Sequence, residues 1–297
     1  MAGARVFPST TIALLYLFNH RHDDDHDDHG GLHRDLTATG SAMGRRDALR
    51  RFAFGAGALA LFGCGDAGSG VLTGADTVID TGGGSTTGGS TCTKIPSETA
   101  GPFPGDGSNG ANVLNQTGVV RSDIRSSFAG LSGSAAGVPL TIRLTLVSAS
   151  TCAVLAGRAV YLWHCDALGR YSLYTSGVTN QNYLRGVQAA DASGVVTFTS
   201  IYPGCYAGRW PHIHFEVYPT LASSTSVVNK IATSQIALPK AANDLVYASS
   251  GYGNSASNAS QISLASDGVF SDGAALELAT VTGSVSSGLV ASLTVAV

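Results

Sequence analysis

Short runs of alternating apolar and polar residues recur along the second half of the chain. From Thr141, the stretch TIRLTLV places Ile142, Leu144 and Leu146 on one face and polar side chains on the other, as in a half-buried strand. Similar runs predict strands at 159–165, 195–201, 212–217, 231–238 and 291–297. Turn signals rich in Gly, Pro and Asp separate them, without long helical patterns. The pattern predicts an all-β protein, a β-sandwich of mixed or antiparallel strands with long loops.

The first 91 residues have the composition of processing and linker segments. Residues 1–42 carry a tract of His and Asp, and we expect them to be a non-native upstream segment or disordered. Residues 43–64 pair Arg45 and Arg46 with an apolar stretch that is too short to span a membrane. This stretch resembles a twin-arginine export signal that ends in a lipoprotein cleavage box at Cys64. Residues 65–91 have the composition of a flexible linker of Gly, Ser and Thr, and we expect 92–297 to be the folded domain.

The signal segment also predicts a location. Lipidation of Cys64 would give an exported protein, periplasmic or on the cell surface, that meets the membrane only through a lipid anchor. A cleaved signal with an incidental cysteine is the alternative. The remaining cysteines form an even set for which the sequence leaves three disulfide pairings open: Cys92, Cys152, Cys165 and Cys205. Their spacing lacks the short C-x2-C pairs that are typical of zinc sites.

Charge narrows the range of partners. The chain of 297 residues has 17 Lys and Arg against 20 Asp and Glu, a formal net charge of -3, and no basic stripe. Because nucleic-acid binding requires such a stripe, a nucleic-acid partner is excluded. A content of 44% hydrophobic residues suffices for one sizeable core, and the composition is compatible with a homodimer.

The predicted strand HIHFEV at 212–217 carries candidate chemistry. Alternation turns Ile213, Phe215 and Val217 toward the core and places His212 and His214 together on the opposite face. Two imidazoles at positions i and i+2 can converge on one metal ion. Two ordinary packed or surface histidines are the competing interpretation.

The other residues that could serve as ligands limit the types of metal site that are possible here. Residues 92–297 contain one further histidine, His164, which we expect to be a hydrogen-bonded core residue. A ferrous site of two histidines and one carboxylate could use Glu216 or an aspartate. Tyrosines are the other candidates, since their oxygens are hard anionic ligands suited to a ferric ion.

The segment from Val160 to Phe215 contains a larger set of motifs. It includes VYLWHCDALGRYSLY and then YLRGVQAADASGVVTFTSIYPGCYAGRWPHIHF. This sequence resembles the core of the intradiol ring-cleavage dioxygenases, the family of catechol 1,2-dioxygenases and protocatechuate 3,4-dioxygenases, and especially its exported single-chain members. The resemblance extends over roughly residues 92–297.

The resemblance implies a metal site enclosed by the long loops of the sandwich. A ferric ion, Fe(3+), would be held by four side chains: Tyr171, Tyr206, His212 and His214. Tyr206 would also be catalytic, as the base that takes up a proton when the substrate binds. Arg209 would be catalytic by stabilising negative charge on the substrate.

The same resemblance implies a substrate and a reaction. Pro102 and Phe103 lie in a segment similar to the family's T-x-G-P stretch at the site entrance, and Gln235 resembles a glutamine on a later strand. These three residues would contact the substrate. The enzyme would cleave catechol-type aromatic diols with O2 between the two hydroxylated carbons and give products of the cis,cis-muconate type. Two alternatives stay open, an exported non-catalytic β-sandwich that binds a ligand and a ferrous oxygenase of the extradiol type.

Overall fold

The computed structural model describes residues 92–297. The expectations for segments 1–42, 43–64 and 65–91, including the lipid attachment at Cys64, lie outside the described residues. Within the described part, no helix combines the length and the apolar character needed to cross a membrane.

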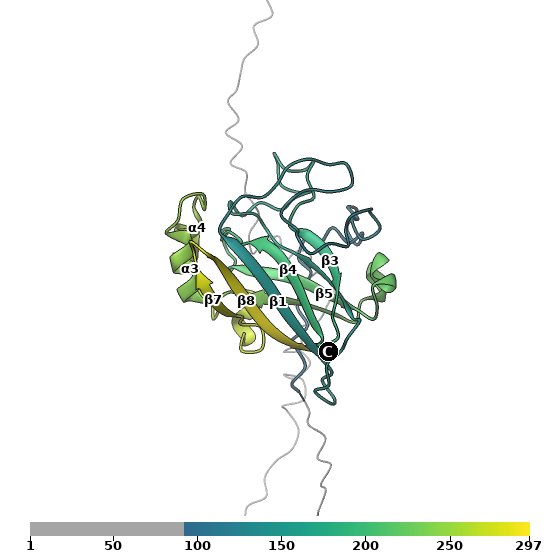
Figure 1. Cartoon of the computed structure of the whole chain (residues 1–297). Coiled ribbons are helices and arrows are strands. Elements are labelled where there is room, and N and C mark those ends of the chain that lie inside the picture. The colour runs from purple at the N-terminus through teal and green to yellow at the C-terminus, as the bar shows by residue number, and fades with distance from the viewer. Residues whose placement is uncertain (1–91) are drawn as a thin grey trace, which may run out of the picture.

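Two four-stranded sheets pack as a sandwich (Figure 1). The first has the order β4-β1-β8-β7 and is formed by Val195–Ile201, Pro139–Val147, Gly288–Ala296 and Thr280–Ser284. The second has the order β3-β2-β5-β6 and is formed by Arg185–Ala189, Ala159–Trp163, His212–Tyr218 and Ala232–Ala237. Strands β1 and β8 are parallel, and the other pairs are antiparallel. The predicted sandwich of mixed strands is confirmed.

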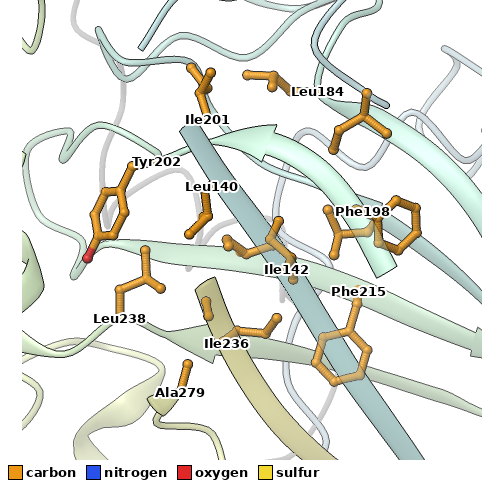
Figure 2. Packing of buried hydrophobic residues seen from close by; sticks show 14 of the residues in the cluster. Leu140, Ile142, Leu184, Phe198, Ile201, Tyr202, Phe215, Ile236, Leu238 and Ala279 are labelled. Carbon is orange, nitrogen blue, oxygen red and sulfur yellow. The ribbon is translucent and has the colours of Figure 1, made fainter. Parts of the chain in front are cut away.

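The core lies between the facing sides of the two sheets. Strand β1 turns Leu140 and Ile142 inward, as its alternation predicts, while Arg143 is exposed. In the opposite sheet, Phe215 of β5 and Ile236 of β6 belong to the same buried cluster, which Figure 2 shows from close by. This burial is the main contribution to the stability of the sandwich, because each fully buried aliphatic or aromatic side chain stabilises by about 1.5–3 kcal/mol.

Two strands of the structure, β3 and β7, were not predicted from the sequence. Strand β3, RGVQA, lacks alternation because its arginine and glycine are buried together with valine. Strand β7, TVTGS, lies at a sheet edge and has almost no buried face. Periodicity detects an alternation of apolar and polar residues, and neither strand has one, because β3 buries an arginine and a glycine and β7 is almost entirely exposed.

The helical segments are short, and all of those in the described residues lie between β5 and β7 in the chain. Helix α3 covers Lys240–Tyr247 and helix α4 covers Ser255–Ser260. Three single turns of 3-10 helix complete the set: η1 Ala222–Thr225, η2 Val227–Asn229 and η3 Phe270–Asp272. Helix α3 lies near β7 in Figure 1, and residues of both elements line one surface hollow.

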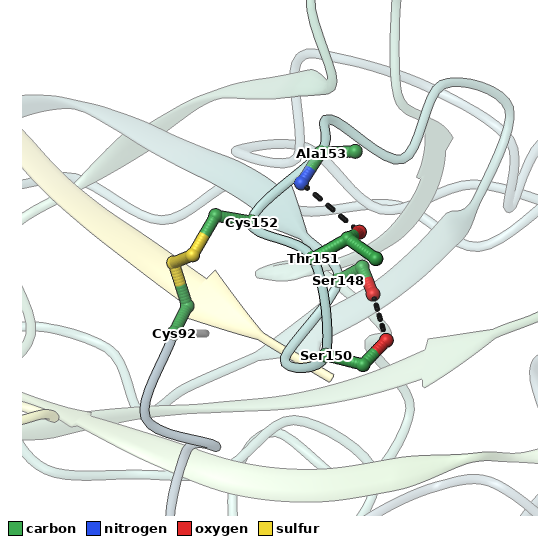
Figure 3. The surroundings of a disulfide bond; sticks show 6 residues. All are labelled: Cys92, Ser148, Ser150, Thr151, Cys152 and Ala153. Atoms are coloured by element: carbon green, nitrogen blue, oxygen red, sulfur yellow. Dashed lines mark hydrogen bonds between the residues drawn. A yellow bond between two sulfur atoms is a disulfide. The ribbon is translucent and has the colours of Figure 1, made fainter. Parts of the chain in front are cut away.

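One disulfide joins Cys92, at the start of the domain, to Cys152 in the turn after β1 (Figure 3). Nearby backbone hydrogen bonds, from Cys92 N to Ala149 O and from Ile95 N to Ala296 O, hold the same segment along the first sheet. Cys165 and Cys205 are free and buried. The four cysteines therefore form one bond rather than two.

Removal of this disulfide should destabilise the domain. The bond closes a loop with a sequence separation of 60 residues, and such cross-links typically stabilise by about 2–4 kcal/mol through the unfolded chain. We expect Cys92→Ser/Cys152→Ser to lower the free energy of unfolding by about that amount, measured by urea denaturation without reductant. Wild-type protein unfolded in the presence of reductant serves as the control and should match the variant. Equal stability of oxidised wild type and variant would contradict the prediction.

Candidate metal centre

Strand β5 presents the two histidines from the middle of its sheet. All seven of its residues are buried. Ile213, Phe215 and Val217 join the main core. His212 and His214 therefore point to the other side of the sheet, as the alternation predicts. His214 pairs with Trp163 of β2 on one side and with Gln235 of β6 on the other.

Two loops bring tyrosines to the same side. Tyr171 follows β2, and Tyr206 lies in the turn between β4 and β5. Asp166 joins these loops, because its backbone oxygen accepts hydrogen bonds from Gly169 N and Gly204 N, both at 3.0 Å. A Cβ at Gly204 would lie 2.5 Å from the backbone oxygen of Ala167, so only glycine allows this approach.

Four donor atoms meet at one point. The phenol oxygens of Tyr171 and Tyr206 each lie 3.3 Å from Nε2 of His212. Nε2 of His214 lies 3.1 Å from the same nitrogen. The rings of Tyr171 and Tyr206 are nearly perpendicular, with an interplanar angle of 72°. All four side chains are buried.

The hydrogen bonding of His212 fits a cation at this point. Its Nδ1 donates to the backbone oxygen of Trp210 at 2.5 Å. Because a carbonyl oxygen can only accept, Nδ1 carries the ring proton. Nε2 is then unprotonated and has one lone pair that can accept a hydrogen bond or bind a metal ion. That lone pair faces three polar atoms within 3.3 Å, more than it can accept from. Two ligands that each lie about 2.0–2.1 Å from one metal ion are about 3 Å apart, which is close to the separations here.

His214 is held mainly by ring stacking. Its imidazole lies flat on the indole of Trp163, with ring centroids 4.9 Å apart and an interplanar angle of 5°. Burial, and after it the neighbouring charge of Arg209 for His212 and the neighbouring His212 for His214, holds the pKa of both histidines well below the usual range. Neutral imidazoles are the form that binds metal ions.

Arg209 and Gln235 lie beside the four donors and contact each other. Nη2 of Arg209 donates to Oε1 of Gln235 at 2.7 Å, and Nε donates to the carboxylate of Asp267 at 3.0 Å. Nε2 of Gln235 donates to the backbone oxygen of Thr99 at 2.9 Å. The sequence placed Gln235 at the site only through a resemblance, and the register of β5 with β6 explains why it lies there.

The segment that contains Pro102 and Phe103 reaches the site through its aromatic ring. Phe103 lies 4.9 Å from Tyr171 and 5.2 Å from Tyr174 between ring centroids. The backbone oxygen of Pro102 instead accepts a hydrogen bond from Asn109. The structure therefore brings Phe103 to the donors, with Pro102 next to it in the chain.

Two other polar residues considered from the sequence have different partners. His164 is hydrogen-bonded within the core, to Ser200 Oγ at 2.7 Å and to the backbone oxygen of Cys165 at 2.8 Å, as expected. The carboxylate of Glu216 binds Tyr218 and Lys230, each at 2.7 Å. Glu216 is therefore engaged away from the histidines. Among residues 92–297, no three His, Cys, Asp or Glu side chains are grouped to hold a metal ion.

Asp267, Phe270 and Trp163 contribute to the site and were missed from the sequence. The ring of Phe270 lies 6.4 Å from that of His212, and the guanidinium of Arg209 lies 6.0 Å from the Phe270 ring. Asp267 and Phe270 sit in SDGVFSD, a stretch that reads as an ordinary turn. Only tertiary structure brings this turn to β5, so no local signal could have identified it.

One family model and several solved structures are similar to this chain. Residues 123–216 match the sequence model of a family described as Dioxygenase, a span that contains both tyrosines and both histidines. The match covers less than half of the chain, and it makes this segment similar to that family. No curated protein sequence matches the chain.

Several solved dioxygenase structures are similar to the chain. The intradiol ring-cleavage dioxygenase from Tetranychus urticae has a TM-score of 0.55 and 24% identity, with coverage of 69% of this chain and 94% of that one. The dioxygenase domain of a carbohydrate-binding fusion protein from Streptomyces sp. SirexAA-E has a TM-score of 0.44 and 20% identity, with coverage of 69% and 98%. Catechol 1,2-dioxygenase from Pseudomonas arvilla C-1 has a TM-score of 0.41 and 19% identity, with coverage of 67% and 60%. At this identity, the Tetranychus urticae structure shows the shared fold.

The contact between the two tyrosine loops should be sensitive to one methyl group. Gly169 has φ +81°, and a Cβ there would lie 3.0 Å from Cβ of Tyr206. Gly177 is a matched control, because it has φ +80° and nothing within 4 Å of its Cβ position. Both Gly→Ala variants should lose about 1–2 kcal/mol to backbone strain, and Gly169→Ala should lose at least about 1 kcal/mol more through crowding. Urea unfolding of the two variants measures the difference, and equal losses would show that Gly169 does not constrain Tyr206.

Proposed function

We propose that the protein is a ferric-iron-dependent enzyme that cleaves catechol-type aromatic diols with O2, between the two hydroxylated carbons. The observation that carries this proposal is that two phenol oxygens and the Nε2 atom of His214 all lie within 3.3 Å of Nε2 of His212. Two phenolates and two neutral imidazoles are hard donors with a net negative charge, which favours a ferric ion over softer or lower-valent metals. When bound, the ion would accept both diol oxygens and withdraw electron density from the ring.

Tyr206 is proposed as both ligand and proton acceptor. A diol that binds through both oxygens as a dianion must release protons, and a phenolate oxygen at the site can take one. Tyr206 is 7% exposed and Tyr171 is 1% exposed, so Tyr206 is the more accessible of the two to an arriving substrate. We therefore assign the proton to the phenol oxygen of Tyr206 and a purely ligating role to Tyr171.

Arg209 and Gln235 are proposed to bind the negative charge of the substrate. The guanidinium of Arg209 is fully buried beside the donors, where a positive charge acts through a low dielectric and is only weakly screened. Its bond to Gln235 fixes the direction of one branch. Phe103 adds an aromatic ring next to Tyr171, and Phe270 adds one next to His212. These rings would exclude water and favour a flat substrate.

The two alternative functions explain fewer of these contacts. A non-catalytic binding module gives no reason to bury a guanidinium, two imidazoles and two phenols together, which is costly without partners and typical of functional sites. A ferrous oxygenase of the extradiol type would need a carboxylate ligand, and the nearest candidate in the strand, Glu216, already binds Lys230 and Tyr218.

Product analysis tests the proposed reaction. Purified protein loaded with ferric ion is given catechol, protocatechuate or hydroxyquinol under isotopically labelled O2. The proposal expects a dicarboxylic acid formed by cleavage between the hydroxylated carbons, with both labelled oxygen atoms incorporated. A ring opened next to the hydroxylated carbons would indicate the extradiol class, and no product from any of these diols would contradict the proposed reaction.

The tyrosines should control colour and iron binding. Phenolate bound to ferric ion gives a visible charge-transfer band, so the loaded enzyme should be red to burgundy. Tyr171→Phe and Tyr206→Phe each remove one phenolate at nearly constant volume, and should weaken and shift this band and lower iron affinity. Tyr174→Phe is a matched control, because Tyr174 also contacts Phe103 but donates to Asn109 instead. Native spectra in both ligand variants would refute the two-tyrosine assignment.

We also propose that the protein is exported and anchored by a lipid on Cys64. The Cys92–Cys152 disulfide supports this proposal, because such bonds are typical of oxidising compartments outside the cytoplasm. Cys64→Ser should move the protein from the membrane fraction to the soluble fraction after export, since the lipid would no longer be attached. Cell fractionation with immunodetection measures this, and unchanged membrane association of the variant would rule out the lipid anchor.

A further inference from the structure

Asp267 is a buried carboxylate next to the site but outside the four donors. It lies between α4 and η3, and its side chain is fully buried. Oδ2 accepts hydrogen bonds from Arg209 Nε at 3.0 Å and from Trp210 N at 2.7 Å. Oδ1 accepts from Val269 N at 2.8 Å and from Phe270 N at 3.1 Å. Four N–H groups therefore fix this one carboxylate.

Three of these four bonds come from backbone and hold the carboxylate still. The bonds from Val269 and Phe270 close the turn that contains Asp267 itself. The bond from Trp210 ties the turn to the residue just before β5. Since backbone N–H groups have no rotamer freedom, the direction of the carboxylate is set by the fold rather than by Arg209.

The fourth hydrogen bond, from Nε of Arg209, lets the fixed carboxylate orient the guanidinium. Both partners of the Arg209–Asp267 ion pair are 0% exposed, so water does not screen it or compete for its hydrogen bonds. Asp267 accepts a hydrogen bond from Nε of Arg209, and Gln235 accepts one from Nη2. Two separate acceptors on one planar group fix its orientation.

We propose that Asp267 is a positioning residue that holds the Arg209 guanidinium in the orientation required for diol binding. The four hydrogen bonds of Asp267 go to Arg209, Trp210, Val269 and Phe270 and not to the four metal donors, so in this proposal Asp267 acts through Arg209. This inference rests on the proposed function, because the role of Arg209 toward the diol does. The proposed role explains why the carboxylate of Asp267 is buried here, although it is not one of the four metal donors.

The variant Asp267→Asn tests the proposal with little change in shape. The amide keeps one oxygen for either pair of N–H donors, and its NH2 group must then face the other pair. The affinity of the iron-loaded protein for catechol under nitrogen, read from the shift of the visible band, should fall by roughly ten-fold or more, as for loss of a hydrogen bond to a charged group. Iron content should stay equal to that of wild type. Asp272→Asn, an exposed change five residues further along the same turn, should leave both values unchanged.

A double variant serves as a control for destabilisation of the fold by an unpaired buried charge. Asp267→Asn alone leaves the Arg209 charge buried without its carboxylate, which can unfold the domain. Arg209→Gln/Asp267→Asn removes both charges. If Asp267 acts through Arg209, the double variant should bind catechol as weakly as Arg209→Gln alone. A clear further loss in the double variant, at equal iron content, would overturn the proposal.

A structural readout separates this inference from the proposed function. In a crystal structure of metal-free Asp267→Asn, or of the variant Asp267→Ala if the first does not fold, the guanidinium should leave Oε1 of Gln235. If it stays on Gln235 as in wild type, Asp267 does not position Arg209, whatever the protein catalyses. If wild type binds neither iron nor catechol but the guanidinium moves, the proposed function fails while the positioning role stands.

Discussion

Strand β5 links the stability of the sandwich to the chemistry of the site, because it is buried on both faces. One face gives Ile213, Phe215 and Val217 to the core. The other face carries His212 and His214, which are also cut off from water. Buried polar atoms must find partners, since each unpaired one costs about 1–3 kcal/mol. The surrounding loops therefore have to supply polar groups, and the two tyrosine loops supply the nearest ones.

The crowding at His212 follows from this burial. Nδ1 of His212 keeps its proton and donates it in a hydrogen bond to the backbone oxygen of Trp210, so Nε2 can accept but not donate. Two phenol oxygens and a second imidazole nitrogen then face one lone pair. A positive ion at the centre would satisfy all four atoms at once, whereas hydrogen bonds alone can satisfy only some of them. The same reasoning applies one layer further out, where the charge of Arg209 is compensated by Asp267 in the absence of water.

The sequence predicts those parts of the molecule that leave a local pattern. Alternation in TIRLTLV and HIHFEV correctly gave two central strands and the sides to which Ile142 and Phe215 point. Motif order gave the two tyrosines and two histidines that the structure brings together. Strand β3 was missed because its buried Arg185 is satisfied by distant partners, namely backbone oxygens of Phe103, Pro104 and Ser172. Asp267 was missed for a similar reason, since its role depends on a hydrogen bond from Arg209, which is 58 positions away in the chain.

The central claim is that the two phenol oxygens and two imidazole nitrogens share one metal ion. Crystals of protein loaded with ferric ion, measured just above and just below the iron absorption edge, test it directly. The account predicts one anomalous difference peak at bonding distance from the phenol oxygens of Tyr171 and Tyr206 and from Nε2 of His212 and His214, and that this peak vanishes below the edge. Iron bound elsewhere, or at the histidines with both tyrosines turned away, would contradict it.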